Sequence, residues 1–268
     1  MRNVDRELRF LLQVTRRLPR VPGCGRLGGM FARFYCRKKR PEVIADVLGH
    51  RMILDPHECV DGQILFCPHL YERREIRHLR RYLAIGDSFL DAGANIGFYS
   101  LIAAQIVGGT GRVLAVEADP GNFDRLEAHV RLNDAQHIIS LSNVGLSDRS
   151  ETLRLGLNLT GNRGGHSFLR KGSEGVMVQC RSLLDVLGEH RFDRIDVAKF
   201  DIEGFEFKVL RAFLEGAPRD LMPRTMLLEQ NDEHLRLGAG DALRLLREHG
   251  YTVRMIKDRD YLAERVAG

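Results

Sequence analysis

The sequence predicts an α/β fold with a mostly parallel β-sheet and helices on both faces of that sheet. Residues 88–101 read as a buried strand that runs through a glycine turn into a helix. Apolar strands and amphipathic helices then alternate along the chain, which is typical of a parallel sheet. Residues 251–256 and 260–263 read as a closing antiparallel hairpin, so we expect the sheet to end in an antiparallel pair.

The first core strand and its turn have the form of a cofactor-binding site. Gly93 and Gly97 allow a sharp turn in which the backbone comes close to a ligand. Asp91 at the strand tip offers a fixed anion to a cationic group, and the amides at the helix start can meet a carboxylate or a sugar hydroxyl. The Gly-x-Asn-x-Gly spacing around Asn95 differs from the Gly-x-Gly-x-x-Gly of dinucleotide enzymes. It therefore favours a cofactor without a pyrophosphate.

A second acid, Glu117, ends the next buried strand at residues 112–117 and lies twenty positions after Gly97. This spacing places a carboxylate at the tip of the neighbouring strand, where it can accept both ribose hydroxyls of an adenosine. Further core strands are expected near residues 138–144, within 194–201 and at 226–231. Helices are expected at residues 72–83 and 239–248. A further helix should begin at residue 119, and another should follow Asp201 and run through residue 214.

Four blocks of residues occur in order along the chain: Asp91-Ala-Gly-Ala-Asn-Ile-Gly97, Glu117-Ala-Asp-Pro120, Asn143-Val-Gly-Leu-Ser-Asp148 and Lys199-Phe-Asp-Ile-Glu-Gly-Phe-Glu206. Together they resemble the successive motifs of the FkbM family of S-adenosylmethionine-dependent methyltransferases. The resemblance covers about residue 71 to the C-terminus. It implies a Rossmann-like class I methyltransferase sheet, the cofactor S-adenosyl-L-methionine, and O-methylation of a hydroxyl on a sugar, a glycan or a secondary metabolite.

The same resemblance bears on the residues that hold the cofactor. It implies that Glu72, preceded by Tyr71, lies over the methionine end, whereas an ordinary acid facing a helix dipole is the alternative. Asn143 and Asp148 follow the strand near 138–144 and are placed to meet the adenine, although turn formation is another role for either. The expected cofactor-binding residues are Glu72, Asp91, Gly93, Asn95, Gly97, Glu117, Asn143 and Asp148.

Methyl transfer to an alcohol requires a group that takes the hydroxyl proton. Asp201 is the first candidate, because it ends a core strand and should face the crevice that Asp91 and Glu117 face; Glu229 and His166 follow. A carboxylate beside a sulfonium has a lowered pKa and is a weaker base, so orienting the acceptor is the alternative role for Asp201. The Asp201-x-Glu203 pair is not sufficient to predict a metal site.

His166 lies in an insert where the alternation of strands and helices stops. Residues 152–157 and 176–180 read as antiparallel ribbons around a polar loop. Long loops on the ligand edge of a sheet are usually functional, so we expect this insert to select the acceptor. For His166 itself, a polar surface position is the alternative to acid–base catalysis.

The chain divides by composition into three segments. Residues 1–40 form a basic arm with twelve Arg or Lys residues and two acids, a local charge of +10 within a net charge of +5. The arm should contain a helix up to about residue 18, and it is a candidate for contact with anionic lipid, nucleic acid or an acidic partner, or a solubilising extension. Residues 41–70 read as a β-rich edge segment with strands near 43–44, 51–54 and 63–66. Residues 71–268 read as the methyltransferase domain.

Composition also bears on location and on metal binding. At 268 residues and 44% hydrophobic, the chain can bury a full core. Its five cysteines lack Cys-x-x-Cys spacing, which suggests neither zinc nor a disulfide framework and fits a reducing cytosol. No apolar run reaches the roughly 18 residues of a membrane span, and the first residues lack the apolar core of a signal peptide. A cytoplasmic location follows, with peripheral membrane contact through the arm as an option.

Three other functions are the alternatives. A nicotinamide oxidoreductase would need the tighter glycine triplet after the first core strand, where this chain has Gly-x-Asn-x-Gly. A nucleic-acid methyltransferase acting on RNA would share the cofactor half and use the basic arm, but residues 228–232 lack the Asn/Asp-Pro-Pro-aromatic pattern that stacks a flipped base. A non-enzymatic membrane-surface module is disfavoured because the cofactor acids are intact.

Overall fold

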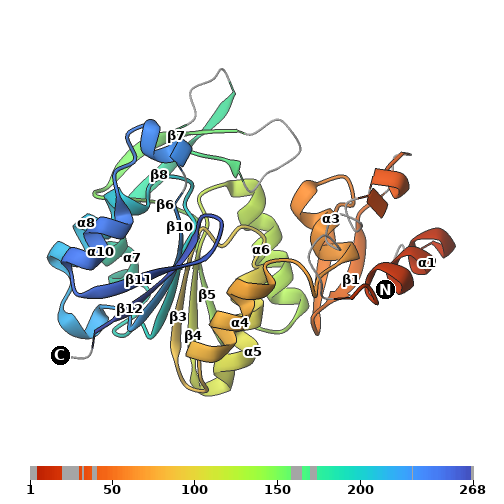
Figure 1. Cartoon of the computed structure of the whole chain (residues 1–268), viewed down its shortest axis with the longest axis horizontal. Coiled ribbons are helices and arrows are strands. Elements are labelled where there is room, and N and C mark those ends of the chain that lie inside the picture. The colour runs from red at the N-terminus through yellow and green to blue at the C-terminus, as the bar shows by residue number, and fades with distance from the viewer. Residues whose placement is uncertain are drawn as a thin grey trace. The chain divides into compact units, whose positions relative to one another are not determined.

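The computed structural model describes residues 5–19, 30–31, 33–37, 41–157, 165–169, 174–230 and 232–266 (Figure 1). The chain forms two compact units, of which the first comprises residues 1–73 with 158–164 and the second residues 74–157 with 165–268. Within the described residues, no helix combines the length and the apolar character that crossing a bilayer requires.

The first unit is built from a capped helix, a hairpin and a second helix. Helix α1 (Arg6–Thr15) begins at Asp5, whose carboxylate accepts a hydrogen bond from the Leu8 amide at 2.7 Å. Strands β1 (Val43–Val47) and β2 (His50–Leu54) pair antiparallel across a two-residue turn. In this turn Leu48 and Gly49 both have positive φ, which suits the twist of a tight hairpin. The predicted basic helix and one predicted hairpin are therefore present.

The strand predicted near residues 63–66 is wrong, because this stretch is part of helix α3 (Cys59–Phe66). The Glu58 carboxylate accepts hydrogen bonds from the amides of Val60 and Asp61, which starts the helix. Ile64, Leu65 and Phe66 are all buried, so three consecutive positions at this end of the helix are enclosed, whereas Gln63 before them is exposed. A short apolar run of this kind fits a buried helix as well as a buried strand.

A large sheet organises the second unit, with the strand order β11-β12-β10-β9-β3-β4-β5 among the described residues. The neighbours from β10 to β5 pair in parallel, whereas β12 runs antiparallel to both β10 and β11. This confirms the predicted parallel sheet with a C-terminal antiparallel hairpin. The strands are β3 (Ser88–Ala92), β4 (Arg112–Val116), β5 (Ile139–Ser142), β9 (Val197–Phe200), β10 (Thr225–Glu229), β11 (Tyr251–Lys257) and β12 (Asp260–Arg265).

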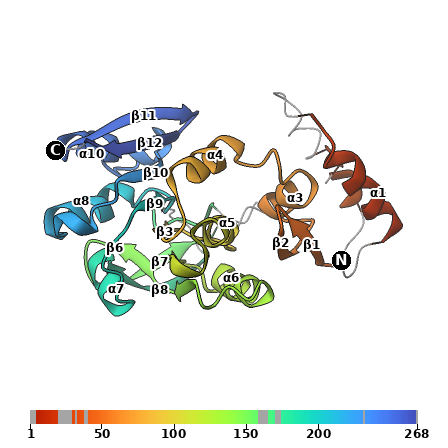
Figure 2. The same cartoon turned by 90° about the horizontal axis from the view of Figure 1, so that it is seen from below.

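Helices cover both faces of this sheet (Figure 2). Helices α4, α5 and α6 lie on one side, and α7 and α8 lie on the other. The helices of the second unit are α4 (Arg73–Tyr82), α5 (Phe98–Val107), α6 (Pro120–Leu132), α7 (Leu183–Glu189), α8 (Glu206–Gly216), α9 (Asp232–Arg236) and α10 (Ala242–Glu248). The connections between consecutive parallel strands therefore pass through helices, as expected for a doubly wound fold.

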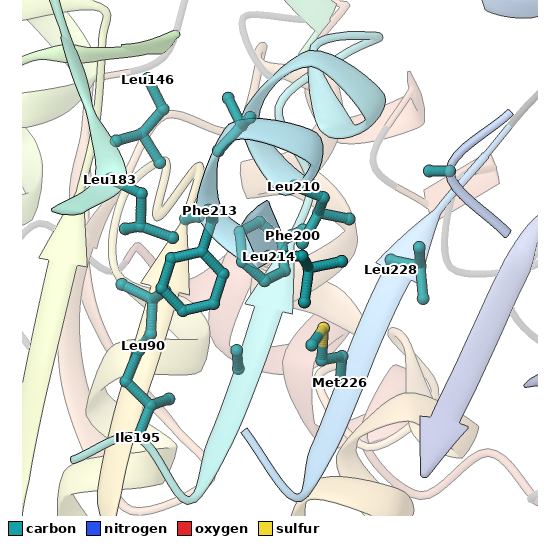
Figure 3. Packing of buried hydrophobic residues seen from close by; sticks show 14 of the residues in the cluster. Leu90, Leu146, Leu183, Ile195, Phe200, Leu210, Phe213, Leu214, Met226 and Leu228 are labelled. Carbon is teal, nitrogen blue, oxygen red and sulfur yellow. The ribbon is translucent and has the colours of Figure 1, made fainter. Parts of the chain in front are cut away.

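Strand alternation sorts the side chains between the two faces of the sheet. Leu90, Phe200 and Met226 join a core with side chains of α7, α8 and α10, as Figure 3 shows for Phe213 of α8. The intervening residues of the same strands point to the α5 face, since successive strand residues point to opposite sides. On that face Asp91 of β3 lies directly beside Lys199 of β9 in the parallel register. This pairing brings the buried Asp91 and Lys199 together next to α5.

The insert forms a small separate sheet, as its alternating sequence predicts. Strand β8 (Gly175–Ser182) pairs antiparallel with β7 (Glu151–Gly156) and parallel with β6 (Gly145–Ser147). The predicted third core strand is shorter than expected, because β5 ends at Ser142 and the chain enters β6 at Gly145. Residues 158–164 and 170–173 of the predicted acceptor loop lie outside the described residues.

Replacing Gly93 by Ala should strongly destabilise the second unit. Gly93 has φ 81°, and a Cβ at this position would collide with the carbonyl oxygen of Asp201 on the neighbouring chain segment. We expect a loss of about 2–4 kcal/mol in the free energy of unfolding, measured by urea denaturation. The matched control is Gly109→Ala, because a Cβ there meets nothing within 4 Å. Equal stabilities of the two variants would contradict this close approach of the backbones.

Candidate active site

The turn between β3 and α5 is held by the end of the neighbouring strand. The amides of Gly93 and Ala94 both donate to the carbonyl oxygen of Val116, at 2.9 and 3.0 Å. Three residues of this turn, Gly93, Asn95 and Gly97, have positive φ values of 81°, 50° and 88°. Asn tolerates this conformation better than most side chains, and Gly adopts it without strain. The Gly-x-Asn-x-Gly pattern is therefore the local requirement of a tight loop at the sheet edge.

Glu117 connects this turn to the tip of β4. Its carboxylate accepts a hydrogen bond from the Asn95 amide at 2.7 Å and another from the Asp119 amide at 2.8 Å. The side chain is buried, and burial raises its pKa to about 7 although the two amide hydrogen bonds act in the opposite direction. An ionised carboxylate has about four acceptor positions, so two amides leave room for two more donors. The two amide hydrogen bonds therefore leave acceptor capacity on this carboxylate.

Asp91 lies behind the same turn and is fully buried. The Ser100 hydroxyl of α5 donates to its Oδ2 at 2.6 Å, while its Oδ1 has no hydrogen-bond partner among the described residues. Burial raises the pKa of Asp91, and the positive charge of Lys199 partly offsets that rise. A buried acceptor without a donor costs free energy, so this oxygen is a place where a ligand or water would be stabilised.

Lys199 joins Asp91 to Asp201. Its Nζ lies 2.8 Å from Oδ2 of Asp201 and 4.7 Å from the ring centroid of Tyr99, over the ring face. Lys199 and Asp201 share one face of the chain because they are two residues apart at the end of β9. The Asp201 amide also donates to the carbonyl oxygen of Ala92, at 3.0 Å. Asp201 is therefore fixed beside the Gly93 turn with its carboxylate still 32% exposed.

Four carboxylates gather after β9 and β10. Besides Asp201, the group contains Glu203, Glu206 and Glu229, whose mutual repulsion adds to the effect of burial. Burial raises the pKa of Glu203 to about 9 and that of Glu206 to about 8. Glu206 accepts hydrogen bonds from the amides of Ile202 and Gly204, at 2.9 Å each, and so closes the turn between them. Glu203, which lies between these two amides in the sequence, has a positive φ of 51°.

Two neighbouring side chains contact this group of carboxylates, and burial lowers the pKa of one of them, His234. Nε2 of His234 lies 3.5 Å from Oε2 of Glu203, and Nε of Arg259 lies 2.9 Å from Oε1 of Glu229. Glu229 is thus brought to the same edge as Asp201 but is already ion-paired. Within the described residues, no cluster of His, Cys, Asp and Glu has a geometry that could hold a metal ion.

His166 reaches the tip of β4 from the insert. Its Nδ1 lies 3.3 Å from Oδ2 of Asp119, and both side chains are nearly buried. Burial acts to raise the pKa of Asp119, but the hydrogen bonds from His166 and the Asn122 amide lower it below its usual value. The next residue, Ser167, donates its hydroxyl proton to the carbonyl oxygen of Glu203 at 2.6 Å. Residues 165–169 therefore bridge the Glu117 side and the Asp201 side of the site.

The remaining predicted residues have other partners. The Asn143 side chain donates to the backbone carbonyl of Glu117 at 2.8 Å, so it supports the β4 tip. The Asp148 carboxylate lies 3.2 Å from Nζ of Lys208 on α8, an ion pair that lowers its pKa. Glu72 belongs to the first unit, where it precedes α4 with φ 41°, and its contact with a cofactor stays a prediction.

Several residues of this site were not singled out as functional from the sequence. Lys199 and Asp119 lie inside the quoted motifs but were given no role, although the alternation from Lys199 to Asp201 along a strand signals a shared face. Tyr99 and His234 carry no pattern that would have identified them. Their places depend on helix packing against β9 and on the turn at Glu203.

Known proteins resemble this chain over part of its length. The family model described as the methyltransferase FkbM domain matches residues 91–253. The chain is similar to methyltransferase sdnD of Sordaria araneosa, with 33% identity over 152 residues that cover 46% of this chain and 58% of that protein. It is also similar to the AMB antimetabolite synthetase AmbE of Pseudomonas aeruginosa, with 30% identity over 209 residues that cover 63% of this chain and 10% of that protein. In both cases the matched stretch spans less than two thirds of the relative.

Among solved structures, the chain resembles a methyltransferase FkbM from Methylobacillus flagellatus KT. The identity is 16% and the TM-score is 0.43, over 96% of this chain and 58% of that one.

The raised pKa values of Glu117, Glu206 and Glu203 predict that stability falls with rising pH. Each folded-state pKa lies above the ordinary value of 4.5, so the folded chain keeps protons that the unfolded chain has released. The free energy of unfolding should therefore be highest below pH 4.5 as far as these groups are concerned, and should fall as pH rises through 7 to 9.

Denaturation at pH 5 and at pH 9 measures this loss in the free energy of unfolding. Glu203→Gln should make the loss smaller by on the order of 1 kcal/mol. Glu215→Gln, at an exposed position of α8, is the matched control and should show the same loss as the unmodified chain. A wild-type stability that rises toward pH 9 would contradict the burial of ionisable carboxyls in the site.

Proposed function

We propose, because this chain belongs to the methyltransferase FkbM domain family, that it transfers the methyl group of S-adenosylmethionine to a hydroxyl of a sugar, a glycan or a secondary metabolite. The observation that carries the proposal is the contact between the Asn95 amide and the Glu117 carboxylate at 2.7 Å, because it joins the glycine turn and the strand-tip acid into one receptor. A methyl group on a sulfonium is electrophilic, so the protein must supply binding, orientation and a proton acceptor.

The residues of the site fit this cofactor. Glu117 lies at the tip of β4 with acceptor positions left for the two ribose hydroxyls, as in other adenosine-binding α/β folds. Gly93 lets the β3 turn pass directly against the carbonyl oxygen of Asp201, so the turn and the residue after β9 lie side by side. The unpartnered Oδ1 of Asp91 offers an acceptor behind the turn. Asn143 fixes the Glu117 carbonyl and thereby supports the receptor from the β5 side.

Asp201 is the residue we assign to the acceptor hydroxyl. It is fixed to β3 through the Ala92 carbonyl and to Lys199 through an ion pair of 2.8 Å, yet its carboxylate stays partly exposed. A carboxylate in this position accepts the hydroxyl proton or orients the oxygen in line with the methyl group. Because the Lys199 ammonium already engages this carboxylate at 2.8 Å, we favour the orienting role for Asp201. His166 and Glu229 are the remaining candidates at the same edge.

A polyhydroxylated acceptor is supported by the polar character of this edge. Asp201, Glu203 and Glu229 can accept hydrogen bonds from hydroxyls, and neutral Glu203 can also donate one at neutral pH because its pKa is raised. RNA is the alternative acceptor, and the charge of +10 in residues 1–40 is the observation that favours it.

Labelled methyl transfer tests the proposal. We expect label from S-adenosylmethionine to enter the carbohydrate or small-metabolite fraction of a host extract when the chain is added, and the Asp201→Asn variant to transfer it at least roughly 100-fold more slowly. Binding of S-adenosylhomocysteine to the same variant should change less than about threefold, because Asp201 acts on the acceptor. Asp124→Asn, an exposed position of α6, is the matched control.

Label found in RNA would contradict a sugar, glycan or metabolite as the acceptor and would support RNA in its place. Full turnover by Asp201→Asn would remove Asp201 from the reaction and leave His166 and Glu229 to be tested in its place.

A further inference from the structure

The first unit exposes large apolar side chains next to arginines. Phe10, Val14, Met30 and Phe34 are 63%, 37%, 63% and 50% exposed, and they are four of the nine exposed large hydrophobic residues in the described part of the chain. Single exposed apolar residues are common, but the Tyr35 hydroxyl lies 3.4 Å from Asp5 and so places residues 33–37 next to the start of α1, which brings these side chains into one region of the first unit. We call this the arm surface, which comprises Arg6, Arg9, Phe10, Val14, Arg17, Met30, Arg33, Phe34 and Arg37.

Helix α1 contributes the first half of the arm surface by exposing the side opposite its buried stripe. Leu8, Leu11, Leu12 and Thr15 are buried and fix the helix to its own unit. The exposed residues Arg6, Phe10 and Arg17 therefore have to face away from that contact, since they are offset from the buried stripe around the helix. The helix is thus amphipathic with an outer side that is both cationic and aromatic.

The second half is held in place by Tyr35. Its hydroxyl donates to Oδ2 of Asp5 at 3.4 Å, and its ring lies edge-on to Phe66 with a centroid distance of 6.1 Å. Residues 30–31 and 33–35 are helical, so Phe34 next to the buried Tyr35 projects outward. The Arg37 guanidinium lies 5.3 Å from the Phe34 ring centroid, over its face. A fixed anchor thus presents exposed Met30 and Phe34 among arginines.

Charge and side-chain type together point to one kind of partner. Residues 1–40 carry +10, which favours a polyanionic surface. Nucleic acid offers phosphates and stacked bases, but the aliphatic side chains of Val14 and Met30 have no ring to stack on a base. A bilayer with anionic headgroups offers phosphates at its surface and an apolar region just below, which matches arginines interleaved with Phe10, Val14, Met30 and Phe34.

We propose that the arm surface docks on an anionic lipid bilayer, with Phe10, Val14, Met30 and Phe34 inserted at the headgroup boundary and the arginines in contact with lipid phosphates. The long arginine side chains can lie along the interface while their guanidinium groups remain hydrated. Docking by this surface is independent of the methyl transfer proposed above, because it involves residues of the first unit alone.

Vesicle sedimentation of the full chain tests this proposal. We expect binding to vesicles of phosphatidylcholine mixed with phosphatidylglycerol, weakening with salt, and much less binding to phosphatidylcholine alone. The variant Phe10→Ser with Phe34→Ser should lower the partition coefficient roughly tenfold, as should Arg6→Gln with Arg9→Gln and Arg33→Gln. The matched control is Met177→Ser with Met255→Ser, which removes two exposed apolar side chains of the second unit, 61% and 58% exposed.

All four positions in the apolar and control variants are exposed, so the buried contacts of either unit should survive, and the melting temperature of each variant verifies this. Three outcomes would overturn the proposal: no binding to anionic vesicles, binding that is indifferent to the two phenylalanines, or capture of an RNA oligonucleotide by a chain that ignores vesicles. Loss of vesicle binding in the aromatic and arginine variants, but not in the control, supports it.

Discussion

The site depends on one carboxylate that two backbone amides hold at the tip of β4. Glu117 accepts from Asn95 in the β3 turn and from Asp119 at the start of α6, so it connects three elements at one point. Because the group is buried, its pKa rises to about 7, and the ligand-free protein retains a poorly solvated acid. Hydroxyl donors from a ligand would stabilise the ionised form. In the function proposed above, the contact that shapes the turn also positions this carboxylate for the ribose diol of the cofactor.

A second constraint is the register between β3 and β9. Parallel pairing places Asp91 beside Lys199 on the α5 face, and Lys199 in turn holds Asp201 at 2.8 Å. From the interior outward, the charged side chains are therefore Asp91, then Lys199, then Asp201. The charge of Lys199 offsets part of the effect of burial and of Asp201 on Asp91, and its ion pair fixes the outer carboxylate. Binding of the cofactor and orientation of the acceptor would then share one element, β9.

Local patterns in the sequence were sufficient for much of the fold, because strand, turn and helix at residues 88–101 are determined by neighbouring residues. The spacing from Gly97 to Glu117 also lies within one strand-turn-helix-strand unit, so the acid at the tip of β4 could be predicted as well. Non-local contacts could not be predicted from the sequence: His166 meets Asp119 across 47 residues, and Asp148 pairs with Lys208 of α8. Residues 63–66 were misassigned because a short apolar run does not distinguish a buried helix from a buried strand.

Calorimetric titration with S-adenosylhomocysteine tests the central role of Glu117 most directly. The unmodified chain should bind with measurable heat, and Glu117→Gln should bind at least roughly tenfold more weakly, because an amide cannot accept from two hydroxyls and two backbone amides together. Glu127→Gln on α6, whose carboxylate pairs with Arg131 at the surface, should bind like the unmodified chain. Equal affinities in all three proteins, or no heat with the unmodified folded chain, would contradict the account.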